Sequence, residues 1–79
     1  MTEQQLKPLS MVGSGEKVKL VKINAGHGLN SRLASMGLVP NVEITVVKSG
    51  HPGPFVISVK NSKMMLGRGM THKIMVQLL

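Results

Sequence analysis

Short stretches in which apolar and polar residues alternate, set between glycines, prolines and asparagines, are the main feature of the sequence. They occupy residues 42–47, 55–60 and 73–79, and their period of two is typical of strands with one buried face. An open sheet of such short strands leaves unpaired edges and buries little surface. We therefore predict an all-β fold, a small SH3-like barrel of about five antiparallel strands with one short helix.

The helix is expected between the first strand, at residues 17–23, and the second, at 42–47. Three apolar residues spaced at i, i+4 and i+7 form the stripe by which it would pack on the sheet: Leu29, Leu33 and Met36. We expect all three in the core, and any one left exposed would mark an interface. Gly37 should end the helix in a left-handed conformation, and Pro40 prevents the helix from continuing.

Turn-forming residues predict three further local features. The apolar positions of residues 17–23 change face after Leu20, which indicates a β-bulge or a bend in that strand. Proline followed by asparagine in residues 39–42 favours a type II turn, because Asn41 tolerates the positive φ angle that this turn requires. Residues 61–62, Asn-Ser, have the length of a two-residue hairpin turn before the next strand.

The charge of the chain first suggests a nucleic-acid partner. Ten lysines and arginines against three acidic residues give a formal net charge of +7, and small basic domains often bind nucleic acids. Base-stacking RNA readers and proline-motif SH3 domains use several exposed aromatic side chains, whereas this chain has one phenylalanine and no tryptophan or tyrosine. Binding to the backbone of a duplex needs only lysine and arginine, so a small basic nucleic-acid-binding barrel stays an alternative.

Side chains that could support catalysis or hold a metal are few and scattered. The isolated carboxylates are Glu3, Glu16 and Glu43, and the isolated imidazoles are His27, His51 and His72. No nucleophile or phosphate-binding motif is present. We therefore expect no enzymatic activity, no cofactor and no metal site. The absence of cysteine excludes disulfides and fits a reducing cytoplasm, while the seven methionines are expected to fill the small core.

The order of four segments adds a resemblance to a known family. The segments are LSMVGSGEK with LVKI (9–17 and 20–23), SRLASMGLVPN (31–41), GP (53–54), and LGR with IMV (66–68 and 74–76). Together they cover about residues 6 to 79 and resemble the FeoA family, whose most characteristic segment corresponds to the second. Two positions differ from the family pattern, because Asn41 replaces a usual glycine and Met70 a usual alanine. Asparagine also accepts a left-handed conformation.

The resemblance implies a single FeoA-like domain over residues 1–79, with residues 1–7 as a flexible tail. Domains of this family are small cytoplasmic SH3-like barrels that assist FeoB, the membrane transporter of ferrous iron, which carries a GTP-binding domain. A similar domain ends the metal-dependent repressors of DtxR type, so a metal-responsive regulatory domain is a further alternative. Nothing in this sequence resembles the DNA-binding helix-turn-helix of those repressors.

Two residues are the best candidates for contact with a partner. Arg32 in the expected helix and Arg68 in the late loop carry guanidinium groups suited to bidentate pairing with acidic side chains. The leading hypothesis is therefore an interaction module that binds the cytoplasmic part of a FeoB-type transporter. Self-association is also open, because a methionine-rich edge at Met64 and Met65 would allow two copies of the chain to pair.

Overall fold

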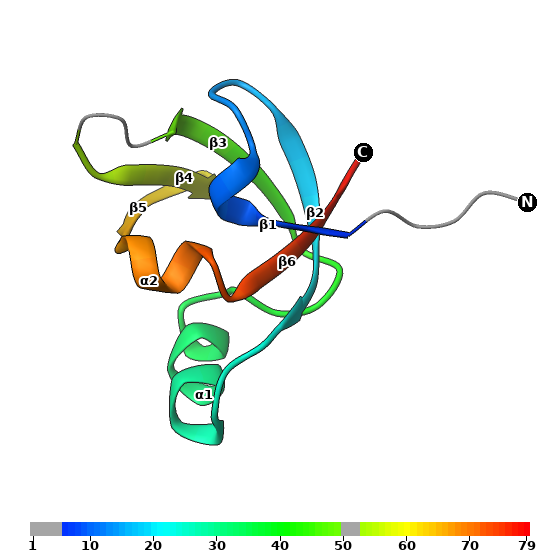
Figure 1. Ribbon diagram of the computed structural model, residues 1–79, viewed down its shortest axis with the longest axis vertical. Coiled ribbons are helices and arrows are strands. Elements are labelled where there is room, and N and C mark those ends of the chain that lie inside the picture. Colours follow the sequence, from blue (N-terminus) through cyan, green and yellow to red (C-terminus); the bar gives the residue numbers. More distant parts are fainter. Residues whose placement is uncertain (1–5, 50–52) are drawn as a thin grey trace, which may run out of the picture.

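The computed structural model describes residues 6–49 and 53–79. Within those ranges the chain forms six strands and three short helical segments, as Figure 1 shows. They are β1 (Lys7–Pro8), the 3₁₀ helix η1 (Leu9–Met11), β2 (Lys17–Ile23), α1 (His27–Ser35), β3 (Glu43–Ser49), β4 (Phe55–Val59), β5 (Ser62–Leu66), α2 (Arg68–Thr71) and β6 (Ile74–Leu78). Most of the tail expected at residues 1–7 lies outside the described ranges, and Lys7 already belongs to β1.

The six strands form one antiparallel sheet in the order β1-β6-β2-β3-β4-β5. The sheet curls around a single interior, and its two edges, β1 and β5, are not paired with each other (Figure 1). Between these edges, α2 carries the chain from β5 to β6 and contacts η1. The mostly-β architecture agrees with the sequence prediction, except that the described residues contain six strands instead of about five.

The interior is filled by aliphatic side chains and the single phenylalanine. Alternate residues of four strands point inward and are buried: Val18, Leu20, Ile44, Val46, Phe55, Ile57, Val59, Ile74 and Val76. Leu33 of α1 and Leu38 after it join this core, together with Leu9 and Val12 near the N-terminal end. The expectation that methionines fill the core holds only in part: no described methionine is buried, but Met64 and Met70 are partly buried and pack against the core. Branched aliphatic residues, with Phe55, fill this small interior.

Three local predictions are confirmed. The pairing of β2 with β6 shifts register between Leu20 and Lys22, which is the expected bulge. Gly37 ends α1 with a φ angle of 98°. Asn41 has a φ angle of 76°, and the turn it belongs to is closed by the N–H of Val42, which donates to the carbonyl of Val39 across 3.2 Å.

The structure corrects three other predictions. The hairpin turn between β4 and β5 is formed by Lys60 and Asn61, both at positive φ, so it lies one residue earlier than expected. Positive φ at both central residues is the type I′ geometry, whose twist matches that of the flanking strands. The main helix begins at His27 instead of Leu29. Arg68, expected in a loop, is instead the first residue of the short helix α2.

Two glycine substitutions with opposite expected effects test where α1 begins and where it ends. Gly37→Ala should lower the free energy of unfolding by about 1–2 kcal/mol, because Gly37 holds a φ angle of 98°. Gly28→Ala, inside α1 with open space around its Cα, should instead raise it by about 0.5–1 kcal/mol. Urea denaturation of both variants measures the two changes. A loss of stability in both variants, or in neither, would contradict the placement of Gly28 inside the helix and of Gly37 at its left-handed end.

Candidate partner-binding surface

Helix α1 projects from the end of β2 and lies outside the sheet (Figure 1). It is held mainly by Leu33, which is 1% exposed, and by partly buried Leu29. Its C-terminal end has the hydrogen bonds of a Schellman motif: the N–H of Leu38 donates to the Leu33 carbonyl across 2.9 Å, and that of Gly37 to the Ala34 carbonyl across 3.0 Å. Both leucines are buried, so this motif fixes the orientation of the helix on the core.

The exposed side of this helix end carries apolar side chains next to an arginine. Met36 is 45% exposed and Val39 is 36% exposed, so the prediction that Met36 belongs to the core is wrong. The reason is the helix end itself: α1 stops at Met36, its C-cap residue, and the chain then turns so that Leu38 is buried instead. We call the exposed residues Arg32, Met36, Val39 and Pro40 the α1 surface. An exposed apolar group with a charged neighbour is typical of a contact surface.

Arg32 lies in the last turn of α1, four residues before Met36 and therefore on the same side of the helix. Its side chain is exposed and forms no hydrogen bond or ion pair with any residue that the structure describes. Its carbonyl accepts a 2.8 Å hydrogen bond from the Ser35 hydroxyl. A cation here also interacts favourably with the helix dipole. The guanidinium group is thus free to contact a partner.

Arg68, the other candidate, lies in a different helix from Arg32. It is the first residue of α2, which follows β5, whereas Arg32 belongs to the helix that follows β2. The side chain of Arg68 lies outside the described part of the structure, as do those of His27 and His51. Arg32 is therefore the candidate that the described geometry places on a defined surface.

A small apolar groove adjoins the α1 surface. It has a volume of about 270 Å³ and lies between α1 and β2, with Leu20, Ile23, Ala34 and Pro40 among its lining residues. Asn30 also lines it. The Nδ2 group of Asn30 donates to the Ala25 carbonyl across 3.1 Å, while its Oδ1 atom is buried without a hydrogen-bond partner among the described residues. An unpaired buried acceptor costs about 1–3 kcal/mol, and because this atom is buried it is not itself open to contact with a partner.

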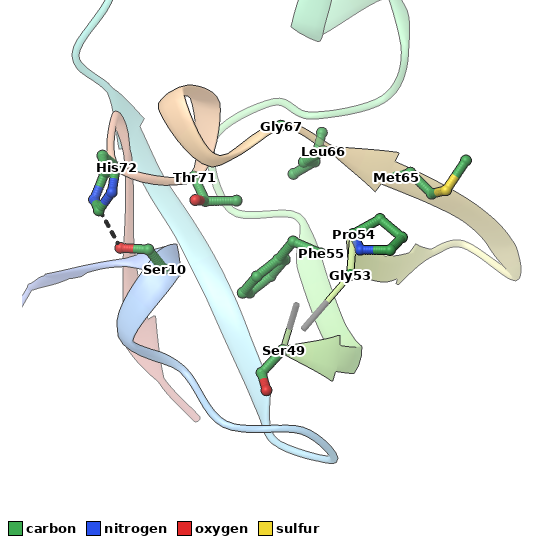
Figure 2. Close-up of a pocket in the computed structure, with 10 residues that line it drawn as sticks. All are labelled: Ser10, Ser49, Gly53, Pro54, Phe55, Met65, Leu66, Gly67, Thr71 and His72. Carbon is green, nitrogen blue, oxygen red and sulfur yellow. Dashed lines mark hydrogen bonds between the residues drawn. The ribbon is translucent and has the colours of Figure 1, made fainter. Parts of the chain in front are cut away.

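A larger groove of about 550 Å³ lies at the seam between the two edges of the sheet, as Figure 2 shows. Phe55 forms its floor, Met65, Leu66 and Gly67 its wall on the side of β5, and Ser10, Thr71 and His72 the opposite wall. The Ser10 hydroxyl and Nδ1 of His72 are hydrogen-bonded across 3.1 Å at this wall (Figure 2). We call this cavity the seam groove.

Sequence reasoning did not find the seam groove, because its lining residues come from η1, β3, β4, β5 and α2, which lie far apart in the sequence. The one local signal was Phe55, the only aromatic residue, placed directly after a glycine and a proline. Among residues 6–49 and 53–79, no three histidine or acidic side chains gather as metal ligands would. The lysines at 17, 19 and 22 follow β2 on its solvent side, with Glu43 directly opposite Lys19.

The comparison with known proteins gives one family. The chain matches the model of the FeoA domain over residues 7–78. It is 41% identical over 70 residues to a Methanocaldococcus jannaschii protein assigned as Fe(2+) transport protein A, and the match covers 89% of this chain and 84% of that protein.

Solved structures agree with this match. A crystal structure of FeoA, described as an iron uptake regulatory protein, has a TM-score of 0.85 and 39% identity, over 95% of this chain and 99% of that one. The solution structure of FeoA from Chlorobium tepidum has a TM-score of 0.82 at 20% identity, over 91% of this chain and 70% of that one. These neighbours have the SH3-like fold, so the predicted fold class is confirmed.

A manganese-dependent transcriptional repressor shares the fold over 100% of this chain and 45% of its own, with a TM-score of 0.87 and 17% identity. At that identity the likeness shows the fold alone. The same barrel therefore occurs both alone and as part of a longer protein, and the barrel by itself does not distinguish the two functions.

Two substitutions, one in α1 and one at its C-terminal end, separate the core from the proposed contact surface. Leu33→Ala should lower the free energy of unfolding by about 2–5 kcal/mol, because this side chain is 1% exposed and attaches α1 to the core. Met36→Ala should change it by less than about 0.5 kcal/mol, because the side chain is 45% exposed. Urea denaturation compares the two, and equal losses would show that Met36 packs in the interior after all.

Proposed function

Because the chain belongs to the FeoA domain family, we propose that it is a small accessory protein of ferrous iron uptake that binds the cytoplasmic GTP-binding part of a FeoB-type membrane transporter. The observation that carries this proposal is the family match, which extends over residues 7–78. Ferrous iron is then the cargo of the transporter, and this chain acts on the transporter by binding, in the cytoplasm and without a reaction of its own. No helix in the described ranges is long and apolar enough to cross a membrane.

The α1 surface is the part of the molecule that we assign to this contact. Met36 and Val39 offer apolar area to a partner, and Arg32 beside them offers a guanidinium with no intramolecular partner among the described residues. Arginine and exposed methionine are both enriched where proteins bind one another. The Schellman motif holds the helix end rigidly, which lowers the entropy cost of binding.

An arginine substitution tests this assignment. Arg32→Glu should weaken binding to the cytoplasmic domain of the transporter about tenfold, or about 1.4 kcal/mol, because it sets a negative charge against an acidic partner. Lys17→Glu makes the same change of charge on the exposed outer side of β2 and should leave binding nearly unchanged. Titration calorimetry with the isolated domain measures both, and a pull-down from native membranes repeats the comparison with the Arg32→Glu, Arg68→Glu double variant.

Two results would contradict the proposal. Equal recovery of the transporter with the wild type and with the double variant would remove both arginines from the contact. Nanomolar binding of duplex DNA or RNA at physiological salt, steeply weakened by added salt, with no association with the transporter domain, would favour the nucleic-acid alternative. That alternative rests on the net charge of +7 and on the lysines that follow β2.

A further inference from the structure

Strand β5 ends the sheet on one side and is paired only with β4. The five pairs from Val59↔Ser62 to Phe55↔Leu66 follow one another without a register shift. The outer side of β5 therefore presents a straight row of backbone N–H and C=O groups, and no described residue forms a backbone hydrogen bond with it outside the pairing with β4. The opposite edge, β1, is only two residues long, so β5 is the longer unpaired edge.

Natural edge strands usually carry features that prevent pairing with another strand, such as a proline, a bulge or a charged side chain. Strand β5 has no proline and no bulge, and its sequence, SKMML, carries one such feature, the exposed side chain of Lys63, which disfavours a basic strand and leaves the edge open to an acidic one. Such an edge is the kind to which an extended peptide adds as a further strand.

The seam groove begins where β5 ends. Met65, 68% exposed, stands at the rim, and Leu66 and Gly67 form the adjoining wall above Phe55 (Figure 2). A strand paired with β5 would thus pass directly along the groove. The volume of about 550 Å³ is ample for one bulky apolar side chain, and the buried ring of Phe55 gives that side chain an apolar floor.

Charge selects the kind of strand that fits this edge. Lys60 and Lys63 are exposed along the β4–β5 hairpin. The Nζ atom of Lys48 lies close to Gly53, which lines the groove: it is 3.8 Å from the point where a Cβ atom built on Gly53 would lie. The described acidic residues, Glu16 and Glu43, are on neither β4 nor β5. Pairing of β5 with a second copy of itself would bring Lys60 and Lys63 of both copies onto one ribbon with no compensating carboxylate.

We propose that the β5 edge and the seam groove together bind an extended acidic segment of a partner protein by strand addition, with one bulky apolar side chain of that segment in the groove. The backbone hydrogen bonds supply affinity, the lysines select acidic residues, and the groove fixes the register. This surface differs from the α1 surface, so the proposal does not depend on contact with the transporter through Arg32.

The test uses the full chain and a fluorescent peptide in which glutamate and valine alternate around one phenylalanine. Fluorescence anisotropy should show saturable binding. A peptide of the same sequence with alternate backbone nitrogens methylated keeps its charge but loses its donors, and it should bind at least about tenfold more weakly. Replacing its phenylalanine with alanine should weaken binding by a similar factor, because the groove then stays unfilled.

Protein variants complete the test. Lys63→Glu should weaken binding of the acidic peptide about tenfold, whereas Lys17→Glu, the same change on β2, and Arg32→Glu on α1 should not. Equal binding of the methylated and unmethylated peptides would overturn strand addition, since charge alone would then explain the affinity. A dimer of the free protein that Lys63→Glu strengthens would also overturn the proposal and assign the edge to a second copy.

Discussion

The two β-bulges are the constraint on which the rest of the structure depends. Val21 in β2 and Val47 in β3 are each an extra residue that has no counterpart in the neighbouring strand. A bulge bends its strand and increases the local twist, so the sheet curls around its aliphatic interior instead of lying flat. The bulge in β2 also brings Ile23 opposite Ile74 and against the core. The seam that remains between β1 and β5 is the space in which the groove forms.

The sequence allowed prediction where one residue decides the local conformation. Gly37 and Asn41 take positive φ angles as expected, because few other residues tolerate them. The hairpin turn was misplaced by one residue, because Lys60 also takes a positive φ angle that the strand pairing imposes on it. The exposure of Met36 and the seam groove were not predictable, since both depend on how elements distant in the sequence pack together.

The residues that determine the fold are different from those that would recognise a partner. Alternating aliphatic residues of suitable size are enough for the interior, which explains why repressors of low sequence identity share the barrel. The features that would recognise a partner are outside that interior: the arginine and apolar residues at the end of α1, and the unpaired edge of β5. Membership of the FeoA family therefore describes the scaffold in detail and its contacts only in outline.

The sheet order also determines when this protein can fold. Strand β2 pairs on one side with β6, so that Leu20 lies opposite Val76 from the far end of the sequence, and β1 pairs with β6 as well. Contacts between residues this distant in the chain slow folding, because loop-closure entropy is lost before they form. During synthesis on the ribosome, one edge of β2 therefore stays unpaired, and the sheet cannot be completed, until β6 has emerged.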